Sequence, residues 1–184
     1  CAETLEGVVI DPGTMRADDT AELAEEVRRL GVRVKYILNT HGHADHVGAA
    51  RQVATRLDIP IRLHRADWEI CPIGIDEPME PGDLQIGEAA VQLVHTPGHT
   101  LGGICLYTEY VEGGTPKKAV FAGDTLFAGS IGRTDFPGGD FDTLLNSIRT
   151  RLFALDDTTT VYTGHGPETT IGTEKRLNPF ARMT

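Results

Sequence analysis

The alternation of apolar and polar residues divides this chain into short strands and a few amphipathic helices. Short apolar runs rich in Val, Ile, Leu and Tyr predict strands. These runs are Val8–Ile10, Val34–Leu38, Ile61–His64, Ala90–His95, Ile104–Tyr107, Lys118–Phe121 and Thr160–Tyr162. The pair Gly113-Gly114 predicts the tip of a hairpin, because two adjacent glycines accept the backbone angles of a tight hairpin turn.

Four segments carry helical signals. Leu23, Val27 and Leu30 recur at helical spacing, and Asp18 or Asp19 is placed to cap that helix. The other expected helices cover residues 48–57, residues 141–152 with Asp140 as the N-cap, and residues 173–177. Residues 71–82, rich in proline and glycine, predict a loop.

Strands outnumber helices, and helices interrupt them along the chain. This order predicts an α/β class fold in which helices cover the outer faces of sheets. A chain of 184 residues suits a single domain spanning residues 1–184.

Charge and cysteine content narrow the choice of partners. The formal net charge of −10 disfavours binding to nucleic acid phosphates. No apolar run approaches the roughly 20 residues that a membrane helix needs. Cys1, Cys71 and Cys105 form an odd set without paired spacing, so we expect no disulfide framework and a reducing, cytoplasmic location. Cys105 lies in a strand-like run and is expected to be buried.

The most informative segment runs from Thr40 to His46 and carries three imidazoles and a carboxylate. His41 and His43 alternate, so in an extended loop both can face one point, whereas Asp45 and His46 face a second point nearby. Neutral imidazole nitrogen and carboxylate oxygen suit zinc, iron or manganese. The segment therefore predicts ligands for two metal ions.

Three further metal-competent residues follow predicted strands, each preceded by a glycine. They are His99, Asp124 and His165. A glycine beside a ligand allows close approach of the backbone. Together with the residues of segment 40–46 they make seven ligands, enough for two ions of four or five ligands each, with Asp124 placed to bridge.

Five motifs occur in an order that resembles the metallo-β-lactamase superfamily. They are Ile10–Gly13, Thr40–His46, Thr96–Thr100, Gly123–Thr125 and Gly164–Gly166. The resemblance covers nearly the whole chain and implies an αββα sandwich, in which two mixed sheets are flanked by helices and the metals lie at one sheet edge. It also implies that the family's usual N-terminal strands are lacking here and that the stretch 68–82 is short.

The resemblance assigns the ligands to two metals. It implies that His41, His43 and His99 bind the first ion. Asp45, His46 and His165 would bind the second ion, and Asp124 would bridge the two. Asp45 and Asp124 are then the expected catalytic carboxylates.

A narrower likeness is to the short bacterial glyoxalase II-like hydrolases. It is carried by residues 122–136, residues 164–172 and Asn178-Pro179-Phe180. It implies a cytoplasmic, binuclear metallohydrolase of the hydroxyacylglutathione hydrolase type, with zinc, or else iron or manganese, as the two divalent ions. Two cations lower the pKa of a shared water from about 15.7 toward 7, and the resulting hydroxide would attack a thioester such as S-lactoylglutathione. Arg133 and Phe136 are candidate contacts for this small anionic substrate.

Three alternatives stay open. A persulfide dioxygenase shares the ligand loop and a segment like Arg133–Phe136, and would use one iron held by His41, His99 and Asp124. A lactonase or a β-lactamase is possible because the fold hosts many chemistries. A metal-binding module without enzymatic activity is disfavoured, because a structural zinc site needs only about four ligands.

Other polar residues near the motifs have structural interpretations. His64 is expected to make structural hydrogen bonds, and His95 to buttress the turn that carries His99. Asp11 would either orient a ligand histidine or serve a plain Asp-Pro-Gly turn. Arg133 would bind either a substrate carboxylate or Asp135.

Overall fold

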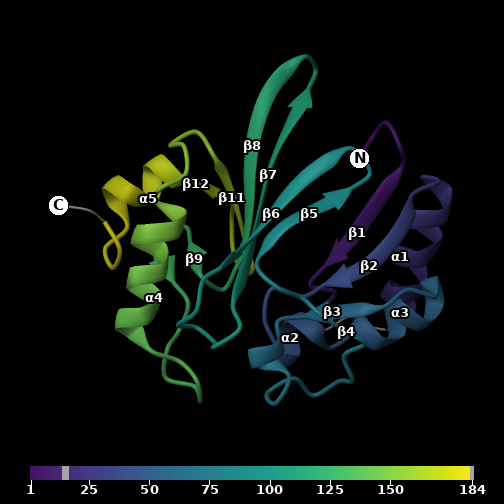
Figure 1. Ribbon diagram of the computed structural model, residues 1–184, viewed down its shortest axis with the longest axis horizontal. Helices are drawn as coiled ribbons and strands as arrows, with labels where there is room; N and C mark the ends of the chain where they lie inside the picture. Colours follow the sequence, from purple (N-terminus) through teal and green to yellow (C-terminus); the bar gives the residue numbers. More distant parts are fainter. Residues whose placement is uncertain (14–16, 183–184) are drawn as a thin grey trace. The chain divides into compact units, whose positions relative to one another are not determined.

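The computed structural model describes residues 1–13 and 17–182, which group into two compact units. The first unit comprises Cys1–Glu80 and Gln85–Ala89, and the second comprises Pro81–Leu84 and Ala90–Thr184. Figure 1 follows the chain from the purple N-terminal strand to the yellow C-terminal helix. Each unit has its own sheet and its own apolar core, so each positions its own candidate ligands.

The first unit is built on a four-stranded sheet in the order β1-β2-β3-β4, with all neighbours parallel. Its strands are β1 (Glu6–Ile10), β2 (Arg33–Leu38), β3 (Ile61–Leu63) and β4 (Glu77–Pro78). The connections are α1 (Ala17–Arg29), α2 (Ala44–Val47), α3 (Ala50–Leu57) and the 3-10 turn η1 (Arg65–Asp67). Parallel neighbours require such crossover connections. Val53 and Ala54 of α3 pack with Ile37 and Ile61 of the sheet to form the core.

A six-stranded sheet in the order β12-β11-β8-β7-β6-β5 makes up most of the second unit, although Gln85 and Ile86 of β5 and Ala89 of β6 are grouped with the first. Its strands are β5 (Gly82–Ile86), β6 (Ala89–His95), β7 (Ile104–Glu112), β8 (Thr115–Gly123), β11 (Thr160–Thr163) and β12 (Thr169–Thr170). A small antiparallel pair, β9 (Leu126–Phe127) and β10 (Ser130–Ile131), follows β8. The remaining elements are α4 (Phe141–Ser147), η2 (Ile148–Leu152) and α5 (Ile171–Leu177).

Apolar side chains alternate along the strands of the second unit, so they gather on one face of its sheet and form the core there. Val120 and Ala122 of β8 and Val161 of β11 are fully buried and pack against Leu144 and Leu152 of the α4–η2 segment. Successive side chains of a strand point to opposite faces, so these residues share one face of the sheet. The helices thereby fix the ends of β8 and β11, where two candidate ligands lie.

Local sequence signals predicted several features that the structure confirms. Gly113 and Gly114 have φ angles of 55° and 79° and join Glu112 of β7 to its partner Thr115 of β8, as a two-residue hairpin turn requires. The Asp140 carboxylate accepts the Thr143 N–H at 2.7 Å and caps α4.

Four local predictions need correction. Asp18 and Asp19 lie in the first turn of α1, which begins at Ala17, where acidic side chains also favour the helix dipole. The expected helix over 48–57 begins at Ala50, after the separate turn α2. The expected helix over 173–177 begins at Ile171. Part of the expected loop over 71–82 pairs as β4, because strand pairing outweighs local composition there.

No helix among the described residues is long and apolar enough to span a membrane. None of Cys1, Cys71 and Cys105 forms a disulfide, and Cys105 is buried as expected.

Candidate metal centre

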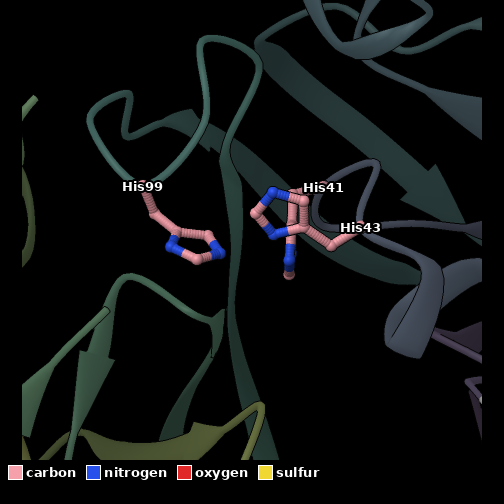
Figure 2. Close-up of side chains that lie close together, drawn as sticks. All are labelled: His41, His43 and His99. Carbon is pink, nitrogen blue, oxygen red and sulfur yellow. The ribbon is translucent and has the colours of Figure 1, made fainter. Parts of the chain in front are cut away.

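The ligand-rich segment of the first unit follows the carboxyl end of β2. His41 is buried in the loop, whereas Asp45 and His46 lie on α2, which begins immediately after His43. The extended-loop interpretation is therefore wrong for the second half of the segment, where the chain turns into a short helix. The His41 ring lies 4.9 Å from the His43 ring at nearly a right angle, and 4.1 Å from the His46 ring (Figure 2 shows the first pair).

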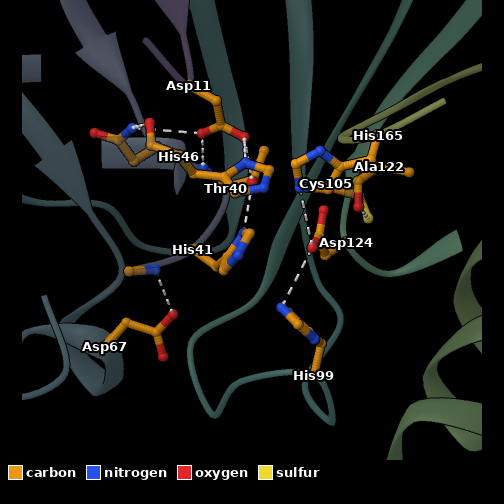
Figure 3. A network of polar contacts seen from close by, with 12 residues as sticks. Asp11, Thr40, His41, His46, Asp67, His99, Cys105, Ala122, Asp124 and His165 are labelled. Atoms are coloured by element: carbon orange, nitrogen blue, oxygen red, sulfur yellow. Dashed lines mark hydrogen bonds and ion pairs between the residues drawn. The ribbon is translucent and has the colours of Figure 1, made fainter. Parts of the chain in front are cut away.

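Asp11, at the turn after β1, orients the imidazole of His46. Its Oδ2 lies 2.9 Å from His46 Nδ1, and a carboxylate can only accept, so Nδ1 donates (Figure 3). In a neutral imidazole the lone pair is then on Nε2. Asp11 also accepts the Thr40 N–H at 2.6 Å through Oδ1. Of the two roles expected for Asp11, the structure shows the one that orients a histidine.

Thr40 links Asp11 to His41 and thereby fixes the tautomer of the His41 imidazole. Its hydroxyl donates its single proton to Asp11 Oδ2 at 2.6 Å. The 3.1 Å contact between Thr40 Oγ1 and His41 Nδ1 must therefore be donated by the ring. The lone pair of His41 is again on Nε2, so one carboxylate sets the tautomer of two neighbouring histidines.

Asp67 braces the backbone between His41 and His43. Its carboxylate is fully buried and accepts the Gly42 N–H at 3.1 Å. A Cβ at position 42 would lie 2.9 Å from the Asp67 carbonyl oxygen, so only glycine fits this approach. The sequence analysis missed Asp67, which lies 25 residues from its partner.

In the second unit, parallel pairing brings two candidate ligands together. Thr163 at the end of β11 pairs with Gly123 at the end of β8, and Gly164 N–H donates to the Gly123 carbonyl at 2.8 Å. Asp124 and His165 follow directly, because the carboxyl ends of neighbouring parallel strands meet at one sheet edge. Asp124 Oδ2 lies 3.7 Å from His165 Nε2.

His99 reaches the same carboxylate from the turn after β6. Its Nε2 lies 3.6 Å from Asp124 Oδ2 (Figure 3). Its Nδ1 lies 2.7 Å from the Arg133 carbonyl oxygen, which can only accept. His99 therefore presents the Nε2 lone pair toward Asp124, and its side chain is only 5% exposed.

Neighbouring elements hold the turn that carries His99. The Ser147 hydroxyl of α4 donates to the Pro97 carbonyl at 2.7 Å. A Cβ at Gly98, whose φ is +129°, would overlap the backbone of Leu144. His95 Nε2 donates to the Leu101 carbonyl at 2.9 Å, which confirms the expected buttressing role of His95. The turn is therefore fixed before any ligand binds.

Within each unit, the donor set fits divalent metal ions. Two atoms bound to one ion at about 2.0–2.2 Å in tetrahedral geometry lie about 3.4 Å apart. Asp124 Oδ2 is separated by 3.6 and 3.7 Å from the nitrogens of His99 and His165, close to this value. In the first unit, Asp11, His41 and His46 each have a ligand-type atom within 4.8 Å of the others, and Asp11 there accepts from the histidine side rather than completing the proposed ligand set.

The two candidate substrate residues lie together on the surface of the second unit. The Arg133 guanidinium makes two hydrogen bonds of 2.7 Å to Asp135 and stacks 3.8 Å from the centroid of the Phe136 ring. The expected salt bridge to Asp135 is therefore present. His64 accepts the Ala66 N–H at 3.3 Å and caps η1, as its structural interpretation predicted.

The family model described as Metallo-beta-lactamase superfamily matches residues 4–165. The chain belongs to this superfamily. It is thus related to enzymes, and its histidine and aspartate clusters fit the divalent metal ions expected from the sequence.

Two curated relatives of this superfamily member differ in activity. Hydroxyacylglutathione hydrolase GloC of Haemophilus influenzae is 38% identical over 94% of this chain and 85% of its own length. The mitochondrial persulfide dioxygenase ETHE1 of Bos taurus is 32% identical over 96% of this chain and 67% of its own length.

Two solved structures confirm the fold class. The BLEG-1 B3 metallo-β-lactamase has a TM-score of 0.78 and 34% identity, covering 97% of this chain and 90% of its own. TTHA1623 in a di-iron-bound form has a TM-score of 0.76 and 36% identity, covering 93% and 87%. The parallel sheet, the mixed sheet and the helices of this superfamily member match the metallo-β-lactamase fold.

We predict that Gly132→Ala weakens metal binding roughly 10- to 100-fold, the usual cost of disturbing groups that support metal ligands. A Cβ at Gly132 would overlap the Asp124 carbonyl oxygen and lie 3.1 Å from His99 Nδ1. Competition with a chelator measures the affinity. Gly74→Ala is the matched control, because its Cβ meets only the flexible Arg51 side chain at 3.5 Å. Equal affinity in both variants would contradict the packing argument.

The Arg133–Asp135 pair predicts a low pKa for an exposed carboxyl. Hydrogen bonding to Arg133 lowers the pKa of Asp135 from 3.8 to about 2. Because the folded-state pKa lies below the unfolded value, any stabilisation by the pair is present above pH 3.8 and is lost as the pH falls through about 2. NMR titration of the Asp135 carboxyl carbon measures this pKa. Arg133→Gln should return it toward 3.8, and an ordinary pKa in the wild type would refute the prediction.

Proposed function

We propose that this chain is a hydrolase with two divalent metal ions that cleaves a thioester such as S-lactoylglutathione. The observation that carries the proposal is the convergence of two imidazole nitrogens on Asp124 Oδ2, at 3.6 and 3.7 Å. A carboxylate flanked in this way is suited to bridge two ions. The similarity to the GloC hydrolase supports a thioester as the class of substrate.

We assign the ligands as the superfamily resemblance implies. His41, His43 and His99 hold the first ion, and Asp45, His46 and His165 hold the second, with Asp124 between them. The tautomers support this assignment, because His41, His46 and His99 each donate through Nδ1 and retain the Nε2 lone pair. Burial of His41, His46 and His99 supports a rigid ligand set.

Bound divalent ions would supply Lewis acidity and lower the pKa of water from about 15.7 toward 7, so that hydroxide is available at neutral pH. The residues of the chain contribute orientation and charge. Asp11 keeps the imidazoles of His41 and His46 in the ligating tautomer. Asp45 and Asp124 contribute the negative charge of the site. Asp124 is only 11% exposed, which limits access of bulk water to it.

Arg133 and Phe136 are proposed to contact the substrate. Asp135 engages Nε and Nη2 of the guanidinium, so the Nη1 edge faces no partner in this pair and is suited to a substrate carboxylate. Stacking on Phe136 holds the guanidinium plane in place. The substrate is thus expected to be a small anion, and the net charge of −10 disfavours nucleic acid as a partner.

A persulfide dioxygenase is the second candidate, because ETHE1 is also similar over nearly the whole chain. That activity would need one iron held by His41, His99 and Asp124, and would leave Asp45, His46 and His165 without a metal. The hydrogen bond from His46 Nδ1 to Asp11 favours two ions, because it orients a histidine that only the second ion would use. Elemental analysis, thioester hydrolysis and oxygen uptake with glutathione persulfide separate the two, and a β-lactam and a lactone serve as further substrates.

Zinc is the first candidate metal, with iron or manganese as alternatives. Imidazole and carboxylate ligands accept all three, and supply often decides. The relative TTHA1623 was crystallised in a di-iron-bound form, which supports testing iron. A cytoplasmic location stays a prediction, and three cysteines that form no disulfide suit a reducing compartment.

We predict that Asp124→Ala lowers kcat/KM for S-lactoylglutathione by at least about 10³-fold, because the variant disturbs both ions and removes a charge of the site. Steady-state kinetics on purified protein supplied with metal, together with metal content, measures the effect. His64→Gln is the control and should keep both activity and metal content, since His64 caps η1. Undiminished turnover by Asp124→Ala would refute the bridging role, and a lost metal equivalent in His64→Gln would show that His64 is a ligand.

A further inference from the structure

A buried carboxylate outside the ligand set lies at the centre of a hydrogen-bond network in the second unit. Glu174 of α5 is 2% exposed. Its Oε2 accepts the Gly129 N–H at 3.0 Å and the Asn178 side-chain amide at 2.8 Å. Its Oε1 accepts the Thr169 hydroxyl at 2.7 Å. Burial of a carboxylate is costly unless it is well hydrogen-bonded, and three donors offset that cost here.

Asn178 completes the attachment of α5 to the same small hairpin. Its side chain is fully buried, and its amide also donates to the Ser130 carbonyl at 2.9 Å. Glu174 and Asn178 are one helical turn apart, so they face the hairpin together. They hold both the N–H of Gly129 and the carbonyl of Ser130, which belong to the turn between β9 and β10 and the start of β10.

This hairpin connects two parts of the candidate metal centre. β9 begins two residues after Asp124, and β10 ends just before Gly132 and Arg133. The Arg133 carbonyl accepts the His99 Nδ1–H at 2.7 Å. The Gly132 Cα packs so closely on the Asp124 carbonyl oxygen that no Cβ fits there. Displacement of the hairpin would therefore move both the His99 acceptor and the backbone of Asp124.

We propose that Glu174 is a positioning residue, which clamps the β9–β10 hairpin through Gly129 and thereby fixes the tautomer of His99 and its orientation toward Asp124. The inference deepens the proposed function, since it concerns the same ligands. It also gives a role to Asn178 and to the residues of stretch 122–136 that follow Asp124, which the ligand assignment alone leaves unexplained.

Two substitutions separate hydrogen-bond geometry from charge. Glu174→Gln can place its oxygen where Oε2 lies and turn its NH₂ toward the Thr169 oxygen, so all three contacts persist without the charge. Glu174→Ala leaves the Gly129 N–H and the Asn178 amide without this acceptor. A positioning role predicts that glutamine preserves the site and alanine does not.

The first readout needs no metal. In metal-free protein at pH 8, ¹⁵N NMR of the His99 ring should show protonated Nδ1 and unprotonated Nε2 in the wild type and in Glu174→Gln. Glu174→Ala should show averaged shifts of the two tautomers. A ring pattern in Glu174→Ala that equals the wild type would overturn the inference.

The second readout is Co²⁺ binding, followed by visible absorption and competition with a chelator. Glu174→Ala should bind Co²⁺ roughly 10- to 100-fold more weakly and with an altered spectrum, as for other groups that orient metal ligands. Leu152→Ala is the control, because it removes buried volume from the same core without touching these hydrogen bonds. It should lower the urea midpoint while leaving the spectrum and the affinity unchanged.

The outcomes distinguish this inference from the proposed function. An equal loss of Co²⁺ affinity in Leu152→Ala and Glu174→Ala would overturn the inference, because general destabilisation would then explain both. A wild type that binds no Co²⁺ would refute the proposed function, whereas the tautomer difference between Glu174→Ala and Glu174→Gln would still support the inference.

Discussion

The candidate site depends on the fixed orientation of its imidazoles. A neutral imidazole has one donor and one acceptor nitrogen, so the group that accepts from Nδ1 decides which nitrogen can bind a metal. Asp11 acts on His46 directly and on His41 through Thr40, whereas the Arg133 carbonyl acts on His99. Thr40 is buried and the Asp11 side chain is only 13% exposed, so little water competes with these two acceptors.

Local and spacing signals in the sequence predicted much of the fold and most of the candidate ligands. The pair Gly113-Gly114 and the cap Asp140 depend only on neighbouring residues, so their roles follow from local chemistry. The ligand segment 40–46 stands out by composition alone. The family resemblance then supplied the fold class, which the comparisons confirm.

Other features have no local signature. Asp67 and Glu174 act on residues 25 and 45 positions away, and only the folded chain brings each pair together. The Arg133 carbonyl is a backbone group, which residue type does not reveal. β9, β10 and β12 have two residues each, too few for a periodic pattern. Residues 44–47 form the short helix α2, which the assumed extended loop did not consider.

The same scaffold hosts several chemistries, so the number of metal ions is the decisive variable. A crystal structure of the metal-loaded protein, with anomalous scattering recorded at the absorption edge of the bound metal, tests this directly. We predict two anomalous peaks about 3.5–4 Å apart, the usual spacing in two-metal sites, with Asp124 bound to both and His99 bound through Nε2. One peak bound by His41, His99 and Asp124, or two peaks without Asp124 bound to both, would contradict the account.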